Sequence, residues 1–264
     1  MPARRPRLIS NRKTFRTLLG DPVAHADIMR RSMESLAAKN ALVTGTSRGI
    51  GRALAQALSD AGARVLCHAR TLADATEVAE AVGGVPIFGD LGRPAELERI
   101  ATQVDEAVAA LHVLVHNAAI NPRPREELGE IDAQVFEAVV GVNVAAPILL
   151  TQRLLPRLRA AGAARVVFIS SEAGQFDGGM RPDGLSYAVS KAALNAASAV
   201  IASAVRPDGI LVNAVHPGWV RTGMGGPDAP LQPEQATATA LMLATLPPDG
   251  PSGCFFFEGR EIPW

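Results

Sequence analysis

Tyr187 and Lys191 are four residues apart in a segment with helical apolar spacing, so their side chains project from one face a single turn apart. Tyr187 is the only tyrosine, and Lys191 is one of three lysines in a chain that otherwise uses arginine. A phenol has a pKa of about 10, and a neighbouring ammonium group favours its ionised form. The pair predicts a tyrosine acid or base whose pKa the lysine lowers, although the spacing alone also fits an ordinary surface pair.

A serine pair ends the apolar segment 165–171, whose β-branched and aromatic residues predict a strand. Ser171 stands at its carboxyl end, and the helical segment that begins at Tyr187 comes next along the chain. Open parallel sheets bind their ligands at the carboxyl ends of the strands. We therefore expect Ser171 to lie beside Tyr187 and to donate a hydrogen bond to a substrate carbonyl.

A glycine-rich turn, residues 44–51, connects the first predicted strand to a helix. Glycine permits unusual backbone angles and close approach to a ligand, and the first amides of a helix attract phosphate, so the turn predicts a dinucleotide site. The candidate contacts are Gly45, Ser47, Arg48, Gly49, Ile50 and Gly51. The same residues spell Gly-x-Ser-x-Gly, the nucleophile elbow of hydrolases. That elbow requires several preceding strands and an oxyanion loop, whereas this turn follows the first strand.

The end of the second predicted strand indicates which dinucleotide binds. Arg70 stands there, without the carboxylate that would pair with the ribose hydroxyl of NAD. Arg48 and Arg70 together suit the 2′-phosphate of NADP(H), and the alternative is two solvated surface arginines. Asp90 and Leu91, after the third strand, are placed to border the adenine.

Short apolar segments alternate with Ala-rich amphipathic ones from residue 40 onward. The predicted strands are residues 40–44, 64–68, 85–88, 112–116, 165–170, 210–215 and 254–257, and the predicted helices are residues 51–60, 73–82, 95–110, 131–159, 187–205 and 233–246. Nearly continuous apolar strands between helices are typical of a parallel sheet that is covered on both faces. The pattern predicts one doubly wound, Rossmann-type α/β domain with a seven-stranded parallel sheet flanked by helices.

Six motifs follow one another in this chain in the order of a known family. They are the glycine turn, Asn117-Ala118-Ala119, Asn143 within Val142-Asn143-Val144, Ser171, the pair Tyr187 and Lys191, and Pro217-Gly218. Over about residues 39–264 the chain resembles the short-chain dehydrogenase/reductase family, in its compact branch. Residues 216–226 and the ending 253–264 look most like carbonyl-reductase and C-signal-type members.

The resemblance implies a role for each residue. Tyr187 would be the general acid in reduction, Lys191 would hold the nicotinamide ribose and lower the pKa of the tyrosine, Ser171 would steady the carbonyl, and Asn143 would anchor a proton-relay water. The cofactor would supply the hydride. Further implied cofactor contacts are Asn117, Ala118, Pro217, Gly218, Val220 and Thr222. The substrate would be a small ketone, aldehyde or alcohol.

Three features depart from the family pattern. Ala119 stands where a glycine is usual, which adds a methyl group beside the cofactor. Ser171 precedes Tyr187 by sixteen residues, more than usual, so a longer loop is expected over the substrate. The segment between Pro217 and Pro233 is short, which favours an open or small lid.

The amino-terminal region differs in charge from the rest. Residues 1–32 contain eight Arg or Lys and two acids, so the remainder carries a net charge of 0 − (8 − 2) = −6 and lacks a basic surface for nucleic acid. We expect residues 1–38 to be a basic, disordered extension and residues 39–264 to be the NADP(H)-binding oxidoreductase domain. The alternatives for the extension are a transit peptide and a true start at Met33.

Other expectations follow from composition. Two cysteines, Cys67 and Cys254, suit a reducing compartment, and no apolar run is long enough for a membrane span, so we expect a cytoplasmic protein without membrane contact. The five histidines show no metal-ligand spacing, so no metal is expected. The small-residue surface of the helix after Tyr187 favours a homodimer or homotetramer. The alternative function is a non-catalytic NADP(H)-binding protein in redox sensing or signalling.

Overall fold

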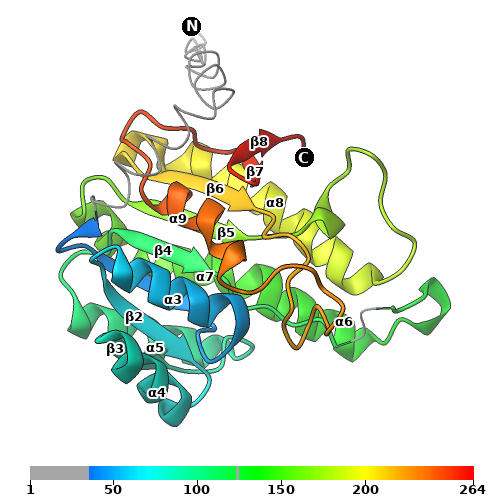
Figure 1. The fold of residues 1–264 in the computed structure, drawn as a ribbon, viewed down its shortest axis with the longest axis horizontal. Helices are drawn as coiled ribbons and strands as arrows, with labels where there is room; N and C mark the ends of the chain where they lie inside the picture. Colours follow the sequence, from blue (N-terminus) through cyan, green and yellow to red (C-terminus); the bar gives the residue numbers. More distant parts are fainter. Residues whose placement is uncertain (1–35, 123–124) are drawn as a thin grey trace, which may run out of the picture.

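The structure, a computed structural model, describes residues 36–122 and 125–264, which include one eight-stranded sheet (Figure 1). Its strand order is β3-β2-β1-β4-β5-β6-β7-β8. The strands are β1 (Asn40–Thr44), β2 (Arg64–Ala69), β3 (Val85–Phe88), β4 (Val113–His116), β5 (Arg165–Ile169), β6 (Leu211–Val215), β7 (Phe255–Phe257) and β8 (Arg260–Ile262). The first seven pair in parallel and β8 pairs antiparallel with β7.

Helices cover both faces of this sheet (Figure 1). They are α3 (Gly49–Asp60), α4 (Leu72–Val82), α5 (Pro94–Ala107), α6 (Ala133–Val140), α7 (Ala146–Ala160), α8 (Leu185–Val205) and α9 (Ala238–Ala244). The core is divided by the sheet: β1 sends Ala41 and Val43 into the cluster under α3, α4 and α9, and Leu42 into the cluster under α5, α7 and α8. This alternation is what a strand buried on both faces requires.

The predicted doubly wound α/β fold is confirmed. Several helix bounds differ from the prediction, most of all the helix predicted over residues 233–246, which is α9 (Ala238–Ala244) preceded by a 3-10 turn (Gln235–Thr237), and two larger details differ as well. The sheet has an eighth strand, because the chain turns back after β7 through Glu258 and Gly259, whose φ angles are +46° and +73°. Both angles fit a two-residue hairpin turn, but glutamate is not a usual residue there, so no turn was predicted at this position. The helix expected over residues 131–159 is interrupted by a π-helical turn, Gly141–Ala145, between α6 and α7.

The strand order reverses between β1 and β4, which are neighbours although they are far apart in the sequence. The first six strands are parallel, so their carboxyl ends, from Thr44 to Val215, lie at one edge of the sheet. Ligands bind in open α/β sheets at such a reversal point. The predicted extension at residues 1–38 falls mostly outside the described residues.

Two helical stretches, Ala133–Ala160 and Leu185–Asp208, are long and apolar enough by length and composition to cross a bilayer. Both contribute buried residues to the core beneath the sheet, such as Leu150 and Leu194. The central helices of an α/β domain pass the same test, so the observation is weak evidence for a membrane span.

Candidate active site

Tyr187 and Lys191 lie near the start of α8, on the same face of the helix. The Nζ atom of Lys191 is 5.5 Å from the centre of the Tyr187 ring. Lys191 is only 2% exposed, and Nζ donates a hydrogen bond of 2.8 Å to the carbonyl oxygen of Ile169, at the end of β5. Burial lowers the pKa of Lys191 from 10.5 to about 7. This lysine is therefore only partly protonated near neutral pH.

The pKa of Tyr187 contradicts one expectation from the sequence. It is raised from 10.0 to about 12 because burial disfavours the phenolate, and a hydrogen bond with the Ser171 side chain acts in the opposite direction. Dehydration of the phenol therefore outweighs any effect of Lys191 on this pKa. Tyr187 therefore keeps its proton at neutral pH.

Ser171 is brought to Tyr187 by a tight turn after β5. Its Oγ accepts a hydrogen bond of 3.1 Å from the amide of Ala173. A Cβ atom on Gly174 would lie 2.5 Å from the amide nitrogen of Ala192, so only glycine lets this turn pack against α8 beside the lysine. The predicted meeting of Ser171 with Tyr187 is thus present in the structure.

Asn143 lies in the π-helical turn and is buried. Its Oδ1 accepts from the amide of Ile120 at 2.8 Å, and its Nδ2 donates to the carbonyl oxygen of Ile120 at 2.9 Å and to Ser190 Oγ at 3.1 Å. Ser190 Oγ donates in turn to the carbonyl oxygen of Tyr187 at 2.7 Å. Asn143 therefore ties the segment after β4 to the catalytic helix, and π turns of this kind are frequent at functional sites.

The glycine turn after β1 has the geometry that a dinucleotide phosphate requires. A Cβ atom on Gly51 would lie 2.1 Å from the carbonyl oxygen of Gly45, so that position admits only glycine. Asn117 closes the turn from β4: its Nδ2 donates to the carbonyl oxygens of Thr44 and Gly45, at 2.9 and 3.1 Å. Ala118 packs on the turn, since a Cβ atom on Gly45 would lie 3.0 Å from its Cβ. The remaining turn residues, Ser47, Arg48, Gly49 and Ile50, lie at or just before the start of α3.

The predicted adenosine side of the site is charged and open. Arg48 precedes α3 and Arg70 follows β2, both are exposed, and neither forms an ion pair with a described residue. Asp90, unlike the two arginines, has an ion-pair partner: its Oδ2 lies 3.6 Å from Arg93 Nε. Its Oδ1 accepts a hydrogen bond from the amide of Gly92 at 2.9 Å. Leu91 is buried next to it. These residues fit the adenosine end of a dinucleotide.

The loop after β6 extends across to the glycine turn. Gly218 has a φ of +86°, and Val220 is buried. The Cγ2 atom of Thr222 lies 3.1 Å from where a Cβ atom of Gly49 would be. This loop therefore lies beside the glycine turn at Thr222. The cofactor contacts that the resemblance implies at Pro217, Gly218, Val220 and Thr222 stay predictions.

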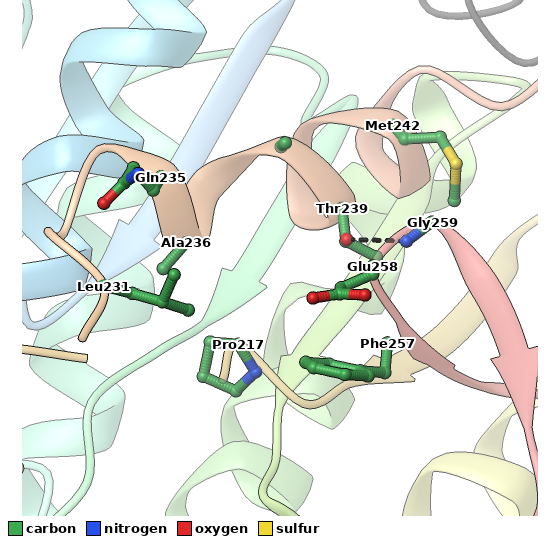
Figure 2. Close-up of a pocket in the computed structure, with 10 residues that line it drawn as sticks. Pro217, Leu231, Gln235, Ala236, Thr239, Met242, Phe257, Glu258 and Gly259 are labelled. Atoms are coloured by element: carbon green, nitrogen blue, oxygen red, sulfur yellow. Dashed lines mark hydrogen bonds between the residues drawn. The ribbon is translucent and has the colours of Figure 1, made fainter. Parts of the chain in front are cut away.

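A hollow of about 250 Å³ lies between this loop, α9 and the turn between β7 and β8 (Figure 2). It is lined by Pro217, Leu231, Gln235, Ala236, Ala238, Thr239, Met242, Phe257, Glu258 and Gly259. None of the Ser171, Tyr187 and Lys191 side chains lines it, so the chemistry is assigned to their cluster and not to this hollow.

Two residues of the site were not predicted from the sequence. His68 in β2 is 1% exposed and joins two loops: its Nδ1 accepts from the amide of Gly45 at 3.2 Å, and its Nε2 lies 3.0 Å from the carbonyl oxygen of Gly89. Asn195 accepts from Ser170 Oγ at 2.5 Å and donates to the carbonyl oxygen of Gly174 at 3.2 Å. A polar residue inside an apolar strand or helix was the only available signal, and it does not reveal the partner.

Comparisons with known proteins agree with this geometry. Residues 39–231 match the short chain dehydrogenase family. The chain is 37% identical over 245 residues to the protein FixR of Bradyrhizobium diazoefficiens, and the match covers 84% of each protein. It is 33% identical over 153 residues to the C-signal of Myxococcus xanthus, and this match covers 58% of this chain and 92% of that protein. The NADPH-bound carbonyl reductase from chicken fatty liver superposes with a TM-score of 0.76 at 29% identity, covering 87% of this chain and all of that one. The chain therefore belongs to the short-chain dehydrogenase/reductase family of NAD(P)-dependent oxidoreductases, which interconvert carbonyl and alcohol groups.

Proposed function

We propose that this protein is an NADP(H)-dependent reductase of a small ketone or aldehyde, with Tyr187 as the proton donor. The observation that carries the proposal is the cluster at the carboxyl end of β5, where the Ser171 and Tyr187 side chains share a hydrogen bond and Lys191 lies one turn along α8. The raised pKa keeps Tyr187 protonated at neutral pH, which suits the donor role in reduction.

Each protein group has a defined task in this proposal. Ser171 donates to the carbonyl oxygen of the substrate, which polarises it and fixes its position. Tyr187 delivers a proton to the same oxygen as negative charge develops on it. Lys191 holds the ribose, and Asn143 keeps the segment after β4 in place. When bound, the nicotinamide supplies the hydride.

The choice of NADP(H) over NAD(H) rests on Arg48 and Arg70, which are exposed, lack ion-pair partners among the described residues and face no carboxylate at the end of β2. Two relatives are named for the same cofactor: an NADPH-dependent aldehyde reductase of Arabidopsis thaliana, at 28% identity, and an L-rhamnose 1-dehydrogenase (NADP(+)) of Thermoplasma acidophilum, at 34%. The proposed assembly is a homodimer or homotetramer that uses the exposed face of α8.

A second candidate is a non-catalytic NADP(H)-binding protein with a signalling role, and the name of one relative, C-signal, favours it. The test is a panel of ketones, aldehydes and quinones with NADPH, and of secondary alcohols with NADP. Turnover of any member that is lost in Tyr187→Phe supports the reductase. Tight NADPH binding without turnover across the panel supports the second candidate.

A further inference from the structure

The loop after β4 contains a buried acid for which the proposed mechanism has no use. Glu126 is 2% exposed and lies in the segment between Asn117 and α6. Its Oε2 accepts two hydrogen bonds from a residue 60 positions later, from the amide of Ser186 at 2.9 Å and from Ser186 Oγ at 2.5 Å. The carbonyl oxygen of Glu126 accepts from the amide of Gly184 at 2.9 Å. One residue therefore connects this loop to the start of α8.

These contacts replace a cap that α8 lacks. The residue before the helix is Gly184, in a left-handed conformation with φ of +70°, and it has no side chain with which to cap the first amides. Helix starts usually satisfy those amides with a local Ser, Thr, Asp or Asn. Glu126 supplies the acceptor from elsewhere in the chain, and its carboxylate lies where the helix dipole favours negative charge.

This cap lies close to the residues proposed to carry out the reaction. Ser186 is the second residue of α8 and Tyr187 is the third, so the amide held by Glu126 is one residue before the proton donor. Lys191 follows one turn later on the same helix. A shift of the first turn would therefore move the Tyr187 hydroxyl relative to Ser171, which is anchored separately through β5 and its turn.

The arrangement also has a cost. Oε1 of Glu126 is buried and has no hydrogen-bond partner among the described residues. A buried carboxylate with an unsatisfied oxygen destabilises a fold, so stability alone does not explain this residue.

We propose that Glu126 is a positioning residue for the reaction: it caps the catalytic helix from the loop after β4 and thereby fixes Tyr187 against Ser171 and the substrate carbonyl. This inference rests on the proposed reductase function. It assigns Glu126 no contact with the substrate or the cofactor.

The decisive variant is Glu126→Ala, with Glu127→Ala as the matched control, because Glu127 is the exposed neighbour on the same loop with the same charge. We expect kcat to fall by about tenfold to a hundredfold in Glu126→Ala, with the KM for NADPH unchanged, because a small displacement of a reacting group costs rates of this order. Glu126→Gln, which retains an acceptor oxygen, should recover part of the loss. Ser186→Ala should lose less, and the double variant should be no slower than Glu126→Ala alone.

Two measurements distinguish a positioning role from a purely structural one: kcat per bound NADPH and the kinetic isotope effect on hydride transfer. If Glu126→Ala only unfolds part of the sample, kcat per bound NADPH and the isotope effect with NADPH deuterated at the transferred position stay at the wild-type values, and the proposal is overturned. If Tyr187 is misplaced, the hydride step slows and the isotope effect rises. An unchanged kcat would also overturn the proposal.

A second measurement needs no turnover. Because Tyr187 is the only tyrosine, its phenolate absorbance after a rapid pH jump reports its ionisation directly. We expect the pKa of Tyr187 to fall from about 12 toward 10.0 in Glu126→Ala, as water reaches a loosened first turn. A pKa equal to that of the wild type would contradict the positioning role. A wild-type protein that reduces no carbonyl would instead refute the proposed function and leave this titration decisive.

Discussion

Lys191 donates its hydrogen bond to the carbonyl oxygen of Ile169 and not to Tyr187, whose ring centre is 5.5 Å from the lysine Nζ. The Lys191 side chain is thus anchored to the end of β5, the strand that leads to Ser171. This contact fixes α8 against the strand and leaves the Tyr187 hydroxyl to Ser171. The tyrosine and the lysine therefore have separable roles, which substitutions can distinguish.

The first prediction concerns that separation. Tyr187→Phe removes the transferable proton and keeps the ring, so kcat should fall by at least about a hundredfold while the affinity for NADPH changes little. Lys191→Ala should weaken both turnover and NADPH affinity, because the lysine anchors α8 to β5 and is proposed to hold the ribose. Steady-state kinetics with calorimetric NADPH titration measures both quantities. Turnover within a few-fold of wild type in Tyr187→Phe would show that another group donates the proton.

The second prediction concerns the cofactor. Charge-assisted hydrogen bonds contribute about 1.5–3 kcal/mol each, less where they are exposed, so we expect Arg48 and Arg70 together to favour NADPH over NADH by at least tenfold in Kd. Arg70→Asp should shift the preference toward NADH, since a carboxylate there can accept from the ribose hydroxyl. Arg64→Ala, an exposed arginine at the start of β2, is the control and should leave the ratio unchanged. Equal binding of both cofactors by the wild type would contradict this assignment.

The strands and the positions of Tyr187, Ser171 and the glycine turn followed from the sequence because they depend on local pattern and strand order. Apolar runs bounded by turns fix where strands end, and a parallel sheet brings those ends together. The loop between Ser171 and Tyr187 is unusually long, yet their contact could be predicted, because one residue is positioned by β5 and the other by α8.

What the sequence did not reveal depends on burial and on contacts between distant segments. The pKa of Tyr187 rises because the fold dehydrates it, and no spacing rule contains that information. Glu126 and Ser186 are sixty positions apart, and each looks like an ordinary polar loop or helix residue in the sequence. The turn at Glu258 uses a residue that seldom adopts a positive φ, so the eighth strand carried no turn signal.

The third prediction concerns pH and stability. Burial lowers the pKa of His116 from 6.5 to about 3, so the unfolded chain binds a proton below pH 6.5 while the folded protein does not until about pH 3. The free energy of unfolding must therefore fall as the pH drops through this window. The expected contribution of His116 between about pH 7 and about pH 5 is about 2 kcal/mol. His68, with a pKa lowered to about 4, adds to it in the same direction.

His116→Asn tests that contribution. Asparagine cannot titrate, so the decline in the free energy of unfolding between these two pH values should shrink by about 2 kcal/mol. The variant also loses the stacking of His116 on Phe168, at 4.9 Å, which lowers stability at both pH values and cancels from the difference. Urea unfolding at each pH measures the free energy of unfolding. A pH dependence equal to that of the wild type would mean that His116 titrates normally in the folded protein.

The last prediction concerns assembly. One face of α8 exposes a stripe of apolar and small residues at helical spacing: Val189 is 42% exposed and Val200 is 69% exposed, with exposed Ala193 and Ala196 between them. Such a smooth stripe permits close helix packing around a two-fold axis.

Ala196→Arg should place an unpaired charge in that contact and raise the dimer Kd by about a hundredfold or more. The same change at half-buried Ala199 should act similarly if the contact extends to it. Ala73→Arg, on exposed α4 across the sheet, is the control and should leave the assembly unchanged. Light scattering at micromolar concentration measures the mass, and a monomeric wild-type protein would contradict the proposed assembly outright, since the exposed stripe would then have no partner copy.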